Sequence, residues 1–128
     1  MNLSRIHHIA IICSNYEISK KFYTEILNLK IIKETYRSER NSYKLDLAVG
    51  YNYQIELFSF EASPSRPSRP EAVGLRHLAF EVSDLQEHIN ELLNHGIVTE
   101  PVRVDELTNK KFTFFADPDG LPLELYEK

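Results

Sequence analysis

The sequence predicts an α+β fold made of two tandem β-α-β-β-β modules that form a curved mixed sheet around a central cleft. Two observations lead to this prediction: one order of elements occurs twice, and the same polar residues stand at equivalent positions in both copies. With 128 residues, 42% hydrophobic and 27% charged, the chain has the size and composition of one globular domain. We therefore expect a single domain over residues 1–128, with module one at 5–60, a linker at 61–74 and module two at 75–128.

The first module begins with a strand and a helix. Residues 5–13, RIHHIAIIC, are rich in β-branched side chains, which is typical of a strand. Ser14 and Asn15 can cap a helix that begins near Tyr16 and runs to about Leu27. Apolar residues at spacings of four, four and three predict the helix face that packs on the sheet, and they are Ile18, Phe22, Ile26 and Leu29.

Three strands and a linker follow the helix. The strands are expected at Lys30–Tyr36, Tyr43–Val49 and Tyr53–Phe60, with a turn at residues 50–52. The stretch from Glu61 to Gly74 holds three prolines and few apolar side chains, so it fits neither a central strand nor a helix interior. We interpret this stretch as the linker.

The order of elements then restarts. Residues 75–82 predict a strand, Ser83 and Asp84 a second helix cap, and Gly96 the end of that helix. Its apolar face is expected at Leu85, Ile89, Leu92 and Leu93. The remaining strands are expected at Val98–Val104, Lys111–Phe115 and Pro122–Tyr126, with residues 117–120 as the turn before the last.

The repeat can be tested by aligning His8 with His77. Ser14-Asn15 then falls on Ser83-Asp84 without a gap. Glu56 follows its histidine by 48 residues and Glu124 follows its own by 47. Because one residue is lost over a whole module, the two halves are interpreted as copies of one unit.

The two glutamates are unusual in their strands. Each is flanked by hydrophobic neighbours that face the other way, because side chains alternate across a strand. A carboxylate in such a strand is costly to desolvate unless it is paired, protonated or bound to a cation. If the first and last strands of each module are neighbours and the modules face each other, one site contains His8, Glu56, His77 and Glu124.

Two imidazoles and two carboxylates suit one divalent metal ion, so the central cleft is predicted to be a metal cleft. This donor set does not distinguish zinc, nickel, cobalt, manganese and ferrous iron. A lone histidine in a strand is more often a packing or hydrogen-bonding residue, and the prediction depends on four residues at equivalent positions. Such a site favours proton transfer beside a polarised carbonyl.

Several motifs resemble the vicinal oxygen chelate superfamily of glyoxalase, bleomycin-resistance and dioxygenase proteins. They are the His-hydrophobic-Ala-hydrophobic openings, the spacing from His8 to Phe22-Tyr23, the sequence Asp117-Pro118-Asp119-Gly120 and the Glu four residues after that glycine. The resemblance spans nearly the whole chain and looks closest to small bacterial glyoxalase I-like proteins of the YaeR type. It implies that the metal ligands are His8, Glu56, His77 and Glu124, with Glu124 as the catalytic base and Glu56 as its pseudo-symmetric catalytic partner.

The resemblance implies a metal-dependent lyase or isomerase similar to glyoxalase I (lactoylglutathione lyase), which moves a proton on a small oxygenated substrate. A small-molecule binding or resistance protein of the bleomycin-resistance type and an extradiol-type dioxygenase are the alternatives. Bacterial glyoxalase I has an Arg four residues after its first ligand His and an Asn four residues after its first ligand Glu, both used on glutathione. Here these positions hold Ile12 and Phe60, so the substrate stays open.

Aromatic residues near the two glutamates, Phe58, Phe60 and Tyr126, are expected to line the substrate site. A net charge of −4 lacks the basic footprint of a nucleic-acid binder, and no apolar run reaches the ~20 residues of a membrane helix. Neither nucleic acid nor membrane is expected as a partner. Without a signal-peptide pattern, we expect a cytoplasmic protein with a small-molecule substrate and, from the resemblance, a homodimer.

Other polar residues are given structural roles. His7 is expected to pack beneath the first helix, His88 and His95 to be solvated, and Cys13 to be buried and inert. The cations near the linker and the last hairpin are interpreted as surface charges rather than substrate ligands, and they are Arg66, Arg69, Arg76, Lys110 and Lys111.

Overall fold

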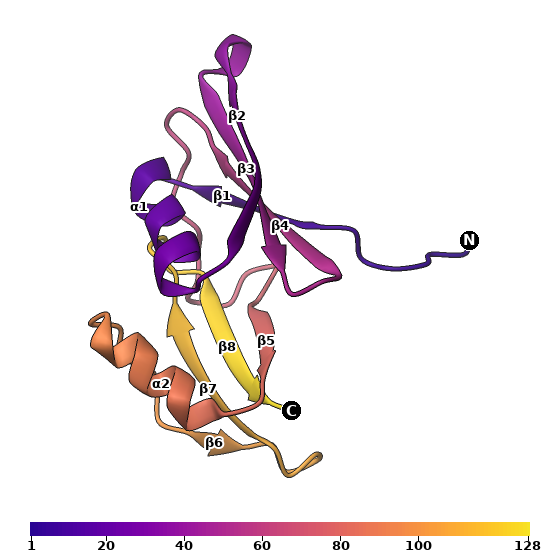
Figure 1. Ribbon diagram of the computed structural model, residues 1–128, viewed down its shortest axis with the longest axis vertical. Helices are drawn as coiled ribbons and strands as arrows, with labels where there is room; N and C mark the ends of the chain where they lie inside the picture. Colours follow the sequence, from indigo (N-terminus) through magenta and orange to yellow (C-terminus); the bar gives the residue numbers. More distant parts are fainter. The chain divides into compact units, whose positions relative to one another are not determined.

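The computed structural model describes residues 1–128 and divides them into two compact units, Met1–Ser65 and Arg66–Lys128 (Figure 1). The boundary falls inside the stretch that separates the two repeats in the sequence. Each unit contains one four-stranded mixed sheet and one α-helix. The predicted α+β fold of two β-α-β-β-β modules is confirmed, with a separate sheet in each module.

In the first unit the helix is continued by a wide turn. Helix α1 spans Tyr16–Lys21, the π-helical turn η1 spans Phe22–Ile26, and a 3-10 turn, η2, spans Ser38–Arg40. The strands are β1 at Ile9–Cys13, β2 at Lys30–Arg37, β3 at Ser42–Val49 and β4 at Tyr53–Ser59. Their order in the sheet is β1-β4-β3-β2, with β1 parallel to β4 and the other pairs antiparallel.

The second unit repeats this topology. Helix α2 spans Leu85–Asn94, and the strands are β5 at Leu78–Val82, β6 at Arg103–Val104, β7 at Lys111–Ala116 and β8 at Pro122–Glu127. The sheet order is β5-β8-β7-β6, again with the first and last strands parallel. The prediction that the first and last strands of each module are neighbours is confirmed.

The core of each unit is the sheet face opposite the glutamates. In the first unit the fully or almost fully buried leucines and isoleucine are Leu45, Leu47, Ile55 and Leu57. In the second unit the equivalent strands bury Phe115, Leu123 and Leu125. Burying each such side chain stabilises the fold by roughly 1.5–3 kcal/mol, so this face fixes the register that positions the opposite one.

The predicted helix caps are confirmed. The side chain of Asn15 accepts a hydrogen bond from the backbone N–H of Ile18 at 3.1 Å, and that of Asp84 accepts one from Glu87 at 2.9 Å. At the other end of α2 the chain reverses at Gly96, whose φ of 76° favours glycine. Both caps satisfy helix N–H groups that have no partner within the helix.

The predicted helix faces are partly wrong. Helix α1 and the turn after it bury Tyr16, Ser19, Phe22 and Tyr23, whereas Ile18 is 56% exposed. Of the predicted face only Phe22 is fully buried, because tyrosine and serine occupy the other inner positions. In α2, Leu85 and Leu92 are buried but Leu93 is 59% exposed, since neighbouring residues lie about 100° apart around a helix.

Several predicted strands are longer than the observed ones. The strands expected at 5–13 and 75–82 begin at Ile9 and Leu78, where their pairing with β4 and β8 starts. The strand expected from Val98 to Val104 is reduced to Arg103–Val104. Apolar alternation alone does not show where partner strands end.

Two further expectations concern Cys13 and membrane helices. Cys13 is buried as predicted. No helix of the structure is both long and apolar enough to cross a membrane.

A polar cluster on the first unit predicts an acid-sensitive contribution to stability. Glu34 accepts a hydrogen bond from the Tyr16 hydroxyl at 2.7 Å, and Lys20 Nζ lies 2.5 Å from the same carboxylate oxygen. Hydrogen bonds from Lys20 and then Tyr16 lower the pKa of Glu34 below its ordinary value. The ionised carboxylate therefore stabilises the fold above its unfolded-state pKa, and this stabilisation is lost as the pH falls through the lowered value.

We expect Glu34→Gln to lower the midpoint of thermal unfolding at pH 7 by about 2–5 °C. The effect is small because the Glu34 side chain is 37% exposed and solvent screens the ion pair. The difference from the wild type should shrink as the pH is lowered towards 3. Glu39→Gln removes the same charge from an exposed residue and should show no such dependence, so parallel curves for the two variants would refute the assignment.

Candidate functional site

In the first unit the histidine and glutamate singled out by the repeat lie together. Ala10 of β1 pairs with Glu56 of β4, and His8 precedes Ala10 by two residues, so the same sheet face carries all three. His8 Nε2 lies 3.7 Å from Glu56 Oε2. The histidine side chain is 40% exposed and the glutamate side chain 12%. A mostly buried carboxylate thus meets an accessible imidazole.

The second unit builds the equivalent pair. Ala79 of β5 pairs with Glu124 of β8, and His77 Nε2 lies 3.0 Å from Glu124 Oε2. The side-chain exposures, 36% and 11%, match those of the first pair. The parallel register of the first and last strands therefore brings His and Glu together in both modules.

The surroundings of the two glutamates differ. Glu56 Oε1 lies 3.0 Å from Lys44 Nζ and accepts a hydrogen bond from Gln54 at 3.2 Å. Lys44 also pairs with Asp46, which stands opposite Glu56 on β3. Burial is the largest single influence on the pKa of Lys44 and lowers it, but the contacts with Asp46 and Glu56 together raise this pKa above its ordinary value. The first glutamate is therefore held in a charged network even without a bound ligand.

Glu124 lies in an aromatic setting instead. Phe114 of β7 stands opposite Glu124, and its ring meets the His77 ring edge-on at a centroid distance of 5.1 Å. Phe112 and Tyr126, the next cross-strand pair on this face, stack at 6.3 Å. His77 is the ionisable partner of Glu124 in this unit. The surroundings of Glu124 are therefore aromatic where those of Glu56 are charged.

The donor chemistry of each pair fits a divalent metal ion. An imidazole nitrogen and a carboxylate oxygen are good ligands for such an ion, and a nearly buried carboxylate is costly to desolvate without a cation. Each unit supplies two of these donors, and the structure contains no group of three or more His, Cys, Asp or Glu side chains that could hold a metal ion.

Of the aromatic residues predicted to line a substrate site, Phe58 and Tyr126 lie on the strand faces that carry the glutamates, and Phe60 follows the end of β4. Phe58 and Phe60 have parallel rings 5.9 Å apart, and both are half-buried. Tyr126 donates its hydroxyl hydrogen bond to Asp105 at 3.0 Å and also contacts Thr108. Phe58 and Tyr126 thus follow Glu56 and Glu124 by two residues on the same strand faces, and Phe60 is reached only through its stacking on Phe58.

Two expectations about other histidines need correction. His7 does not pack beneath the helix: it is exposed, and its Nδ1 lies 2.9 Å from that of His8. Regular strand pairing starts only at Ile9, so the alternation assumed for His7 does not extend to it. His95 is exposed as predicted, whereas His88 is half-buried with a ring nitrogen 2.7 Å from the Asp84 carbonyl oxygen.

The arginines of the linker region have local partners, as expected for surface cations. Arg69 and Arg76 pair with Glu71 at 3.3 and 3.6 Å, and Arg66 donates to Ser68 and to the Leu75 carbonyl. The turn at residues 117–120 is structural, since the Asp117 side chain accepts from the backbone N–H groups of Asp119 and Leu121.

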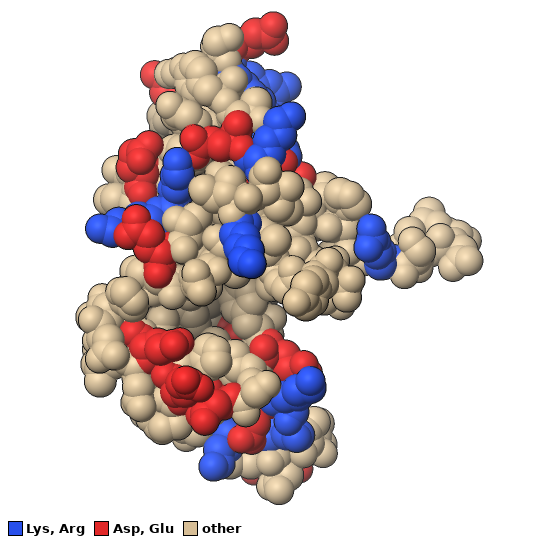
Figure 2. Space-filling view, in the orientation of Figure 1, with Lys and Arg blue, Asp and Glu red and all other residues tan.

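Sequence reasoning missed three residues of the first unit, namely Arg37, Lys44 and Asp46. The sequence pattern could have indicated Lys44 and Asp46, because they alternate with the apolar Leu45 and Leu47, which are buried. Charged residues in such a strand must share the face that carries Glu56. Figure 2 shows Lys and Arg interspersed with Asp and Glu on the face that it presents, so overall charge does not single out these positions.

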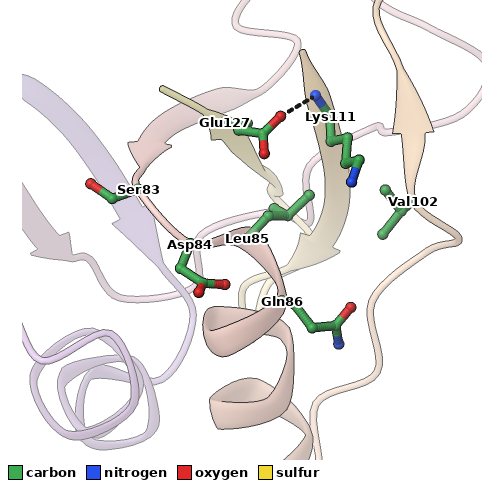
Figure 3. A pocket seen from close by; sticks show the side chains of 7 residues that line it. All are labelled: Ser83, Asp84, Leu85, Gln86, Val102, Lys111 and Glu127. Carbon is green, nitrogen blue, oxygen red and sulfur yellow. Dashed lines mark hydrogen bonds between the residues drawn. The ribbon is translucent and has the colours of Figure 1, made fainter.

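A pocket of about 370 Å³ lies elsewhere on the second unit, at the start of α2 (Figure 3). Its lining includes Asp84, Lys111 and Glu127, and the backbone N–H of Lys111 donates to Glu127 at 3.1 Å. These two strand residues alternate with Phe112 and Tyr126, so they face away from Glu124. None of the predicted site residues lines this pocket.

Two curated relatives match the chain over its full length. A Bacillus subtilis protein described as uncharacterized protein YwkD is 62% identical and is covered completely. The Escherichia coli uncharacterized protein YaeR is 55% identical, over all of this chain and 99% of that protein. The resemblance to proteins of the YaeR type is therefore confirmed.

Solved structures share the fold. A glyoxalase family protein from Enterococcus faecalis is 53% identical, with a TM-score of 0.91 over 99% of this chain and all of that chain. The fosfomycin resistance protein FosX from Listeria monocytogenes, solved with Mn(II) and sulfate, has a TM-score of 0.76 over 99% of this chain and 94% of that chain. At 17% identity that likeness concerns the fold alone.

A protein-family model also matches the chain. The family described as the glyoxalase/bleomycin resistance protein/dioxygenase superfamily matches residues 5–125, which include both His–Glu pairs and all strands except the last two residues of β8. The topology, the paired residues and the relatives agree over nearly the whole chain. The chain belongs to the glyoxalase/bleomycin resistance protein/dioxygenase superfamily.

Proposed function

We propose that this protein is a metal-dependent lyase or isomerase similar to glyoxalase I, acting on a small oxygenated substrate. The observation that carries the proposal is the repetition of one buried Glu beside one accessible His at equivalent strand positions in both units. Packing alone gives no reason for two nearly buried carboxylates, each next to an imidazole. A shared divalent cation gives one.

The proposed ligands are His8 and Glu56 from one unit and His77 and Glu124 from the other. Zinc, nickel, cobalt, manganese and ferrous iron all suit these donors, and FosX, a superfamily protein of the same fold, was solved with Mn(II). When bound, such an ion would supply Lewis-acid polarisation of a substrate oxygen. The other catalytic tasks fall to the chain's own side chains.

Glu124 is the proposed general base. Its carboxylate lies in the aromatic setting of Phe114, with His77 as its ionisable neighbour. On leaving the metal ion it would take a proton from a substrate carbon and return it to the neighbouring atom. Glu56 is the pseudo-symmetric partner, which Lys44 and Gln54 hold in place. Glu124 thus moves the proton, and Glu56 is a metal ligand held in a fixed orientation.

Phe58, Phe60 and Tyr126 are proposed to contact the substrate, since Phe58 and Tyr126 lie on the glutamate-bearing faces and Phe60 stacks on Phe58. Ile12, which pairs with Phe58 and is 54% exposed, offers an apolar surface where glyoxalase I has an arginine for glutathione. We therefore propose a substrate other than a glutathione adduct. A cytoplasmic homodimer is the proposed form of the enzyme.

Metal content is the first test. Protein purified without added metal should contain close to one divalent ion per site by elemental analysis, and less than about 0.1 per chain would count against catalysis. A metal-free protein that still binds small molecules would instead support the binding or resistance alternative. Consumption of oxygen with an aromatic diol would support the dioxygenase alternative.

Turnover is the second test. The hemithioacetal of methylglyoxal and glutathione should be converted poorly with nickel, cobalt or zinc, whereas other carbonyl compounds should exchange carbon-bound hydrogen for deuterium in heavy water. Proton NMR of a compound panel measures both. Efficient conversion of the hemithioacetal would show that Ile12 and Phe60 do not exclude glutathione.

The charged network of the first unit gives a prediction about metal affinity. Lys44 Nζ lies 3.0 Å from Glu56 Oε1, so a metal ion must compete with this lysine for the carboxylate. We expect Lys44→Met to raise the affinity for zinc by up to about tenfold, or ~1.4 kcal/mol, in competition titrations with a chelating dye. The matched control is Lys33→Met, which removes an exposed lysine of β2 and should leave the affinity unchanged. Weaker zinc binding by Lys44→Met would contradict the competition.

A further inference from the structure

One cation of the first unit is not used by the proposed catalytic machinery. Arg37, at the end of β2, lies over two aromatic rings, with its Cζ 5.0 Å from the ring centroid of Phe58 and 5.6 Å from that of Phe60. The two rings are nearly parallel, with 5° between their planes. The guanidinium therefore rests on an aromatic shelf made by Phe58 and Phe60, where cation–π attraction holds it.

This guanidinium has no anionic partner. Its Nη2 donates to the neutral hydroxyl of Ser42 at 2.7 Å, while its Nε is buried with no hydrogen-bond partner. None of the ion pairs of the chain includes Arg37. An arginine has five N–H donors in a planar fork, so most of the donor capacity of Arg37 is unused.

The second unit provides an internal comparison. Arg103 also lies over two phenylalanines, 5.1 Å from the Phe112 centroid and 5.3 Å from that of Phe114. Arg103, however, pairs with Glu100 at 2.9 Å. Both units thus place an arginine over two phenylalanine rings, but only the first leaves its charge without a carboxylate.

Arg37 lies on the same sheet face as the His8–Glu56 pair. Lys44 connects the two regions, since its Nζ is 5.8 Å from the Phe58 centroid and 3.0 Å from Glu56. Lys44 is itself neutralised by Asp46 and Glu56. The series Glu56, Lys44, Phe58, Arg37 thus leads from a proposed metal ligand, across an aromatic surface, to an unpaired cation.

We propose that Arg37 binds the carboxylate of a small organic acid whose apolar part lies against Phe58. A guanidinium fork matches a carboxylate with two parallel hydrogen bonds, and an aromatic ring offers a flat apolar surface to the rest of the ligand. This inference names the substrate class of the proposed enzyme and in that respect rests on the proposed function. The binding itself involves no metal ligand and can be measured without metal.

The test compares benzoate with benzamide, which have the same ring and differ in charge. Each is titrated into the full-length, isotope-labelled protein after removal of metal with a chelator, and amide resonances are followed by NMR. Benzoate should bind at least about tenfold more tightly than benzamide and should shift the resonances of Phe58 and Phe60. Equal affinities, or shifts confined to the second unit, would overturn the proposal.

Variants test the residue itself. Arg37→Gln should weaken benzoate binding about tenfold or more, whereas Arg40→Gln, which removes the same charge from an exposed arginine three residues away, should change it less than twofold. Thermal unfolding verifies that each variant is folded, and the comparison of the two ligands on the wild type decides the question if Arg37→Gln does not fold. Phenylphosphonate binding more tightly than benzoate would overturn the assignment to carboxylates.

The two proposals fail separately. Benzoate binding that depends on Arg37, in a protein that takes up no metal, would support the acid-binding shelf and reject the metal enzyme. A protein that binds metal and exchanges substrate protons, but does not distinguish benzoate from benzamide, would support the enzyme and reject the shelf.

Discussion

Glu124→Gln is expected to lower the rate of proton exchange on the best substrate by about 10²–10⁴-fold, the usual contribution of a positioned general base. Glutamine keeps the shape of the side chain and can still form a hydrogen bond with His77, but its amide does not accept a proton at neutral pH. Glu124 sits on β8 between Leu123 and Leu125, which are buried on the other face, so the isosteric change leaves the core intact.

The measurement is deuterium incorporation at a substrate carbon, followed by proton NMR in heavy water with saturating metal. Glu91→Gln is the matched control, because it removes the same charge from an exposed position of α2 and should keep the wild-type rate. Elemental analysis of Glu124→Gln should still find some bound metal, since three of the proposed ligands remain. Turnover within threefold of the wild type would remove Glu124 from the role of base.

The internal repeat and the equivalent positions of Glu56 and Glu124 could be predicted from the sequence. The repeat was readable because helix caps and buried strands obey local rules: Asn15 and Asp84 cap their helices as the sequence predicts. The equivalence of Glu56 and Glu124 follows from period-two alternation, which a strand cannot change without moving its hydrophobic set to the other face. Both were therefore predictable from the residues.

The helix faces and strand ends were less predictable. The position of Ile18 depends on which stripe of α1 meets the sheet, and tyrosines with polar tips can lie on that stripe as well as aliphatic residues. Tyr16 shows this, since its ring stacks on Tyr43 at 4.2 Å while its hydroxyl reaches Glu34. A pattern that counts only apolar residues does not register such a contact.

The unlike surroundings of the two glutamates could not be read from the repeat. Symmetry predicts equivalent positions, but Lys44 and Asp46 on β3 correspond to Phe112 and Phe114 on β7, and this becomes visible only from the pairing of each strand with its neighbour. Arg37 was missed for the same reason, because its contacts with Phe58 and Phe60 join residues more than twenty positions apart. The divergence of the copies, rather than their likeness, separates the proposed base from the proposed orienting ligand.

Loss of either ligand histidine, His8 or His77, is expected to remove almost all bound metal. His8→Gln and His77→Gln should each weaken zinc binding by more than about 100-fold, since even an outer partner of a ligand is worth 10–100-fold. His95→Gln, an exposed histidine outside both pairs, is the control. Elemental analysis and competition titration at pH 7.5 measure the result.

The pattern of loss tests whether the two His–Glu pairs form one site. If they do, each single variant loses the whole metal content, because half of the ligand set is damaged; if each pair binds its own ion, each variant loses only half. Mixing unfolded His8→Gln and His77→Gln chains and refolding them together extends the test. A site shared between two copies would regain roughly a quarter of the wild-type metal, since half of the random dimers would hold one intact site of two. A site formed within one chain would regain none, because every chain then carries one damaged pair.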